Sequence, residues 1–138
     1  MRSITPASGI TVKEYLASAV GNVFSSATID ADAVSTVDSQ SKKYLNKGVL
    51  LAKINTPASA SGLVGPWDPT GTDGRELTAN IVGFNDTFAD LSEGDVEVGV
   101  LIRGMVKTDQ VVMGAADGSI PDHYKEYVRG DSLDIIFR

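Results

Sequence analysis

The most constraining feature of this sequence is a strict alternation of side chains in its second half. From Val96 to Ile102 a β-branched apolar residue occupies every second position. Successive side chains of a strand point to opposite faces, so the pattern predicts a strand with one buried face. Arg103-Gly104 interrupts the alternation, and residues 105–107 continue it.

Other short apolar runs lie on either side of this strand, bounded by turn-forming residues. They predict strands over 48–54, 79–84, 111–113 and 133–138. Pro121–Arg129 is typical of a brief helix, with proline in the first turn and Gly130 as a stop. The chain has 14 glycines, many of them at strand ends, which fits the tight bends of a small barrel-like sheet. Residues 46–138 are therefore expected to form one mainly β domain.

Residues 1–45 have a different character, because Ser, Thr and Ala dominate there. The stretch from Ser25 to Ser41 has no aromatic residue and few large apolar ones. Burial of so little apolar surface does not offset an ordering cost of roughly 1–2 kcal/mol per residue. We therefore expect a flexible linker over 25–45, and an N-terminal arm, extended or partly helical, that becomes ordered against a partner.

Within this arm, residues 12–24 have helical periodicity. Thr11 and Glu14 form a capping-box pattern at the start. A helix of this length is marginal alone, so its stripe must pack either on its own domain or on a partner, and the polar linker favours a partner. The apolar stripe consists of Val12, Tyr15, Leu16, Ala19, Val20, Val23 and Phe24.

Composition excludes several classes of function. Asp and Glu number 18 against 12 Lys and Arg, a formal net charge of −6, which argues against binding to nucleic acid. The absence of cysteine excludes disulfides, thiolate metal sites and cysteine nucleophiles. No apolar run is long enough to cross a membrane, and the N-terminus has no continuous apolar core of a signal peptide.

Candidate chemistry is sparse. His123 is the only histidine and no Gly-x-Ser-x-Gly motif accompanies it, so we expect no catalytic or metal-binding residues and no cofactor. The acidic residues lie mostly in turns, where Asp caps its own backbone; Asp68 to Asp73 resembles a calcium loop only weakly, because it lacks the EF-hand pattern. Trp67 is expected to be a core side chain beneath a turn, although a ligand platform is the open alternative.

The order of these elements resembles that of the lambda-type head decoration proteins of tailed bacteriophages. The resemblance covers Gly48 to Val106, and its features are a strand, an aromatic-Asp pair, a Thr-Asp-Gly turn, a second strand and a hairpin strand. They lie at 49–54, Trp67-Asp68, Thr72-Asp73-Gly74, Ile81–Phe84 and 94–101, followed by Arg103-Gly104.

The resemblance implies a β-tulip fold for residues 46–138 and a homotrimer on the outer surface of the expanded capsid. It implies a structural protein, not an enzyme, that is made in the host cytoplasm and becomes part of the virion. Its partners would be the major capsid protein and itself, and it would stabilise the shell against the pressure of packaged DNA. The stripe residues of the arm would contact the capsid, and structural roles would fall to Trp67, Asp68, Asp73, Gly74, Gly83 and Gly104.

A second class of function remains open from the residues alone. A β-barrel ligand- or carbohydrate-binding module could use Trp67 and the nearby aspartates as its site. Such a module would need no residues from the N-terminal arm. A capsid-stabilising protein would need them.

Overall fold

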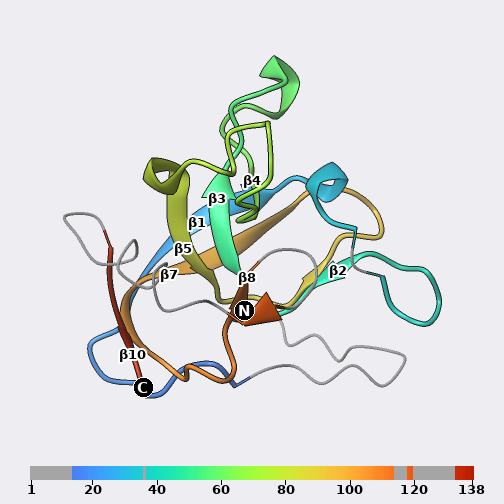
Figure 1. Cartoon of the computed structure of the whole chain (residues 1–138). Helices are drawn as coiled ribbons and strands as arrows, with labels where there is room; N and C mark the ends of the chain where they lie inside the picture. The colour runs from blue at the N-terminus through green and yellow to red at the C-terminus, as the bar shows by residue number, and fades with distance from the viewer. Residues whose placement is uncertain (1–13, 36, 114–117, 120–132) are drawn as a thin grey trace.

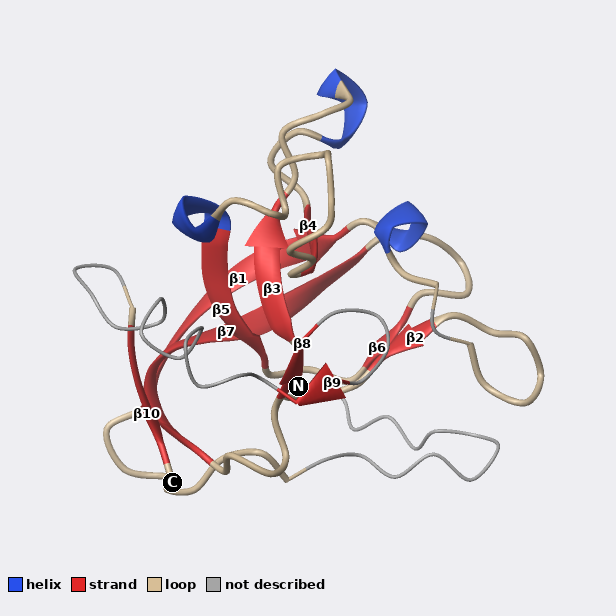
Figure 2. Cartoon of the chain, in the orientation of Figure 1, coloured by secondary structure: helices blue, strands red, loops and turns tan. Residues whose placement is uncertain are grey.

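The structure is a computed structural model that describes residues 14–35, 37–113, 118–119 and 133–138. It is mainly β, as the sequence predicts, and its only helices in this part of the chain are short 3-10 turns at the periphery (Figure 2). In chain order the elements are β1 (Val23–Ile29), η1 (Ala31–Ala33), β2 (Tyr44–Leu45), β3 (Leu50–Lys53), η2 (Ala58–Ala60), β4 (Val64–Pro66), η3 (Thr78–Asn80), β5 (Ile81–Asn85), β6 (Ala89–Asp90), β7 (Val96–Val106), β8 (Val112–Met113), β9 (Gly118–Ser119) and β10 (Asp134–Phe137).

Five strands close into a small barrel. The hydrogen-bonded order is β1-β4-β3-β5-β7, and β7 pairs again with β1, which closes the ring. The β1–β4 pair is parallel and the other four pairs are antiparallel. Figure 1 shows β3 and β5 crossing in front of β1 and β7. A closed ring leaves few free strand edges, which is how small β proteins avoid edge-to-edge association.

The long strand β7 organises the barrel. Its first part pairs with all of β1, from Val96 opposite Ile29 to Arg103 opposite Val23. On its other side it pairs first with β5 and then, from residue 103 onward, with β10 in parallel. Gly104 continues the strand with a φ of 155°, so the predicted interruption at Arg103-Gly104 does not end it.

Gly83 allows the close approach of β5 to β7. Its φ is 134°, a conformation that favours glycine, and an added Cβ would collide with the backbone oxygen of Leu101. The pairing of Phe84 with Leu101 follows directly after this position. The glycine therefore decides how tightly the two strands pack.

The core consists of two clusters of buried apolar side chains, and each draws on segments that are far apart in the chain. The first cluster includes Tyr15, Trp67, Phe84, Leu101 and Ile135. The second includes Ile29, Val34, Leu45, Leu51, Val64, Val98 and Val100. Residues from the predicted arm are thus part of the same core as the barrel.

The predicted flexible linker over 25–45 is wrong. These residues form most of β1, then η1 and β2, and Ile29, Val34 and Leu45 are no more than 3% exposed. By itself this segment has too little apolar surface to become ordered. In the folded protein β7 supplies hydrogen-bond partners along the whole of β1, so few apolar side chains suffice to order it.

The predicted helix over 12–24 is also wrong for the residues that the structure describes, from Glu14 onward. Leu16 forms a β-bridge with Val106, and Val23 and Phe24 begin β1. A short amphipathic helix is only marginally stable by itself, so it is less stable here than a strand that is hydrogen-bonded to β7. The proposed boundary at residue 45 therefore does not separate two bodies, because the chain on both sides of it builds one barrel.

The strands predicted between 48 and 113 form with small changes of boundary, as β3, β5, β7 and β8. The predicted C-terminal strand is β10. The sequence did not indicate β1, β2, β4, β6 or β9. The predicted helix at Pro121–Arg129, including His123, lies outside the described residues, as does Val12.

Candidate interaction sites

The structure divides the predicted helical stripe into a buried part and an exposed part. Tyr15 is 1% exposed, and its hydroxyl donates a hydrogen bond of 2.6 Å to Asp86 Oδ1. Burial first, and then the hydrogen bond and the charge of Asp86, raise the pKa of the Tyr15 phenol far above its usual value. Tyr15 is therefore a core residue and is not available to a partner.

The residues next to Tyr15 attach the N-terminal segment to the end of β7. The backbone N–H of Ala17 donates to the Met105 oxygen at 2.9 Å, and that of Lys107 donates to the Tyr15 oxygen at 2.7 Å. Leu16 is half-buried and packs against the first core cluster. This part of the predicted arm is therefore fixed to the barrel.

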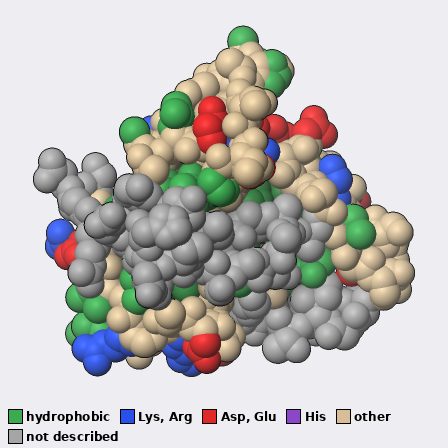
Figure 3. All heavy atoms as spheres, in the orientation of Figure 1, with side chains coloured by type: hydrophobic (Ala, Val, Ile, Leu, Met, Phe, Trp, Pro, Cys, Tyr) green, Lys and Arg blue, Asp and Glu red, His purple; other side chains and the backbone are tan. Residues whose placement is uncertain are grey.

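The exposed part begins at Ala19. Val20 is 83% exposed, Val23 43% and Phe24 45%, and Ala19 is exposed beside them. We call Ala19, Val20, Val23 and Phe24 the N-terminal apolar patch. Figure 3 shows one face of the molecule, where hydrophobic side chains reach the surface in several places, including the lower left. These four residues lie within one short stretch of the chain, and exposed apolar side chains are candidates for an interaction surface.

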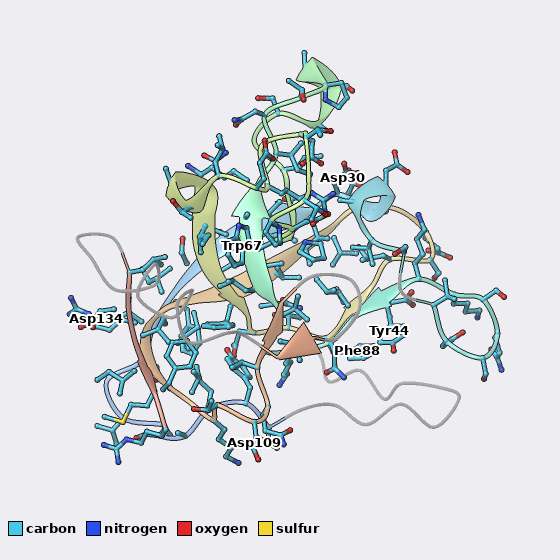
Figure 4. All side chains as sticks on the ribbon, in the orientation of Figure 1. Asp30, Tyr44, Trp67, Phe88, Asp109 and Asp134 are labelled. Carbon is cyan, nitrogen blue, oxygen red and sulfur yellow. The ribbon has the colours of Figure 1, made fainter. Side chains whose placement is uncertain are left out.

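Trp67 lies in the core, as one of the two sequence interpretations expected. It is 1% exposed, its backbone N–H donates to the Leu50 oxygen at 2.8 Å, and its ring lies near the middle of the molecule (Figure 4). A carbohydrate platform needs an exposed aromatic face. The alternative site on Trp67 is therefore contradicted.

The aspartates around Trp67 are used within the fold. Asp68 accepts hydrogen bonds from the backbone and the hydroxyl of Thr70, and these bonds lower the pKa of its carboxyl, the hydroxyl bond most of all. Asp73 accepts from Arg75 Nε at 2.9 Å, and Arg75 also donates to the Ala33 and Pro66 carbonyl oxygens. Arg75 thus links the loop that was compared with a calcium site to η1 and to β4.

Gly74 belongs to this loop and has a φ of 109°. A Cβ at this position would lie 2.8 Å from the side chain of Asn55. The residues named for structural roles, Trp67, Asp68, Asp73, Gly74, Gly83 and Gly104, are all at turns, close approaches or buried positions. Among the described residues, no group of three His, Asp or Glu side chains is arranged to hold a metal ion.

Two hollows lie away from these residues, and neither was indicated by the sequence. The first, of about 630 Å³, is an open cleft lined by Lys42, Lys43, Leu91 and Glu93, among others. Lys43 Nζ donates to the Ala31 oxygen at 2.9 Å across its base. Ser92 donates two hydrogen bonds to the neighbouring Asp90 and lowers the pKa of that carboxyl. The lining of the cleft thus mixes polar and apolar residues, and the Lys43 ammonium group is already used within the fold.

The second hollow, of about 230 Å³, lies at the mouth of the barrel. We call it the barrel-mouth cavity. All five barrel strands contribute to its lining, which consists of Ser25, Ser26, Ala27, Lys53, Gly62, Val64, Val82, Val100 and Ile102. The sequence could not indicate it, because these positions meet only when the ring closes.

No protein-family model matches the chain, and no curated protein matches it with significant similarity. No helix in the described ranges is long and apolar enough to cross a membrane.

Proposed function

We propose that this protein is a head decoration protein of a tailed bacteriophage. In this proposal it binds the outer surface of the expanded capsid as a homotrimer, contacts the major capsid protein and stabilises the shell against internal DNA pressure. It acts mechanically and not as an enzyme, and it is part of the virion. The proposal begins with the sequence resemblance over Gly48–Val106.

The positions of the resembling segments support the proposal. The run 49–54 forms β3, the run 81–84 forms most of β5, and the run 94–101 leads into β7. Trp67 lies in the core between them. The features that carry the resemblance therefore belong to one connected barrel, which is the kind of body that a cementing protein needs to transmit force between neighbours.

The observation that carries the proposal is the N-terminal apolar patch. Val20, Val23 and Phe24 are 43–83% exposed, and they lie directly after the segment that is fixed to β7. Burying them against another subunit would stabilise the contact by about 25 cal/mol for each Å² of apolar area. A rigid barrel with an exposed apolar patch fits a protein whose role is to hold other subunits.

The capsid contact differs from the one expected from sequence. Within the described part of 14–45, β1 is a strand of the barrel and β2 pairs with β6, so these residues do not form a free arm that becomes ordered on the capsid. The contact is instead assigned to the patch, which is already positioned in the free protein. Three copies in a trimer would present three patches, and once one is bound the others engage at high effective concentration.

Two measurements test the proposal. The mass of the free protein is determined by sedimentation, and its binding is measured by co-sedimentation with expanded tailed-phage heads that lack a decoration protein. We expect a trimer and saturable binding to the heads. A protein that is monomeric at all concentrations and does not bind any expanded head would contradict the proposal.

A charge in the patch tests the role of the patch itself. Val20→Asp combined with Phe24→Asp should weaken head binding at least tenfold, because charged groups would have to be buried at the contact. Leu77→Asp is the matched control, since Leu77 is 47% exposed and lies outside the patch at the start of η3. Equal binding by the double variant and the control would remove the patch from the proposed contact.

A further inference from the structure

The barrel-mouth cavity exists because the barrel closes weakly at one seam. β1 and β4 pair through a single residue pair, Ile29 with Val64, whereas β1 pairs with β7 along its whole length. Ser25, Ser26 and Ala27 precede that pair on β1, and all three line the cavity. Their side chains are too small to fill the space that the seam leaves.

The floor and walls of the cavity are apolar. Val64 and Val100 are no more than 2% exposed, and Ala27, Val82 and Ile102 are half-buried around them. Gly62 at the rim has a φ of 89°, and no atom would meet a Cβ there, so the rim is open on that side. An aliphatic group that enters from this side would leave water and contact the methyl groups of the valine and isoleucine side chains.

The rim has one positive charge. Lys53 is the last residue of β3 and is exposed, and no carboxylate in the described part of the chain lies within ion-pair distance of its ammonium group. Ser25 and Ser26 also line the cavity, and Ser25 lies on the same face of β1 as Ala27 and Ile29, whereas Ser26 lies on the opposite face. The polar side chains on the cavity side are thus the Lys53 cation and the Ser25 hydroxyl, which suit an anionic headgroup.

We propose that the barrel-mouth cavity binds a medium-chain aliphatic carboxylate, with its hydrocarbon chain on the valine and isoleucine side chains and its carboxylate at Lys53. A volume of about 230 Å³ is roughly eight water volumes of about 30 Å³ each. That space fits a short hydrocarbon chain and is too small for a long-chain lipid tail. An inorganic anion would gain nothing from the apolar walls, and a cation would be repelled by Lys53.

The proposal is independent of the proposed capsid function, because the cavity and the N-terminal apolar patch share no residue. Head binding could fail while the carboxylate binds, and the reverse could also occur. A bound carboxylate would add contacts across the β1–β4 seam. The ligand is therefore expected to raise the melting temperature of the free protein by mass action.

The test is a titration of the full chain with octanoate below its micelle concentration, followed by the methyl NMR signals of Val64, Val82, Val100 and Ile102. We expect saturable shifts at these methyls. Octylammonium has the same chain and the opposite charge, and we expect it to bind at least fivefold more weakly. Absence of saturable shifts with octanoate, or equal affinity for the two ligands, would overturn the proposal.

A pair of lysine variants tests the position of the carboxylate. Lys53→Met should weaken octanoate binding roughly fivefold, the effect of losing one partly exposed ion pair. Lys107→Met is the control, because Lys107 is exposed and lies outside the cavity lining, and it should bind octanoate as the wild type does. Equal weakening by the two variants would show that overall charge, and not Lys53, attracts the ligand. Because the wild-type comparison of octanoate with octylammonium needs no variant, the proposal can be contradicted even if a variant does not fold.

Discussion

β1 and β7 are hydrogen-bonded to each other over seven residues of β1, yet their sequences look unlike each other. β7 alternates apolar and other residues, and its sequence alone predicts a strand. β1 reads VFSSATI, has four exposed residues in a row, and suggests a linker. The comparison teaches that a strand can be specified by its partner. β7 is regularly patterned, and its backbone N–H and C=O groups can pair with a neighbouring strand. β1 pairs with it although only one of its side chains, that of Ile29, is fully buried.

The anchor of β1 is Ile29 at its end. It is 0% exposed, and it is also the residue that pairs with Val64 to close the barrel. The rest of β1 contributes backbone hydrogen bonds and a partly exposed surface. β7 differs because buried residues occur along most of its length. The stability of β1 therefore depends on few side chains, whereas that of β7 depends on many. Three experiments test how much the fold depends on β1 and on the residues that attach the N-terminal segment to β7.

The largest effect is expected from removal of residues 1–40. The sequence alone suggests that the β domain folds without them. The structure leads to the opposite expectation, because the deletion removes Tyr15 and all of β1 and leaves one edge of β7 without a partner. We expect the truncated chain to lose its cooperative urea unfolding transition, followed by circular dichroism. A sharp transition near the wild-type midpoint would show that β1 is dispensable.

A smaller effect is expected from Ile29→Ala. Removal of most of this buried side chain should lower the free energy of unfolding by about 2–5 kcal/mol, measured by urea denaturation. Thr28→Ala is the matched control on the adjacent, half-exposed position, and it should change stability by no more than about 0.5 kcal/mol. Similar losses in both variants would mean that β1 is held by its backbone and not by its anchor.

The smallest effect is expected from Tyr15→Phe, which removes the hydrogen bond to Asp86. We expect a loss of about 1–2 kcal/mol at neutral pH. The folded-state pKa of Tyr15 is raised, so the stability that depends on its neutral phenol is complete below about pH 10 and falls as the pH rises further.

The pH dependence gives this prediction a second measurement. Between about pH 9 and about pH 11 the wild-type free energy of unfolding should fall more steeply than that of Tyr15→Phe, because the variant has no phenol at this position to ionise. Parallel curves for the two proteins would contradict the assignment of a buried, neutral Tyr15. The other tyrosines contribute equally to both proteins and cancel in the comparison.

Sequence reasoning worked best where the local pattern and the tertiary environment agree. The strands at 48–54, 79–84 and 96–107 were predicted correctly because their apolar residues recur with the spacing at which strand side chains face the core. Trp67 was expected in the core because it lies among turn-forming residues. The helix prediction failed over the described residues 14–24, because the spacing of their apolar residues fits a helix although the segment forms a bridge and a strand with β7. There Tyr15 and Leu16 pack beside β7, while Val20 and Phe24 are exposed.

The candidate sites divide in the same way. Val20, Val23 and Phe24 were named from the sequence as partner-contact residues, but as part of a helix that does not form in the described chain. Lys53, Val82 and Val100 were not named at all, since nothing in their spacing marks a cavity. They lie on three different strands, and they line a common space only because β5 and β7 close the ring back to β1.

By itself the sequence determined that the chain is mainly β, where its well-patterned strands lie and that no cysteine chemistry is available to it. These properties follow from local residue order, which sets the period of burial along each strand. The tertiary structure alone decided that β1 completes the barrel and that a cavity opens where β1 meets β4. The physical reason is that hydrogen bonds to a distant strand and the burial of single anchors such as Ile29 depend on contacts far apart in the chain, which no local pattern records.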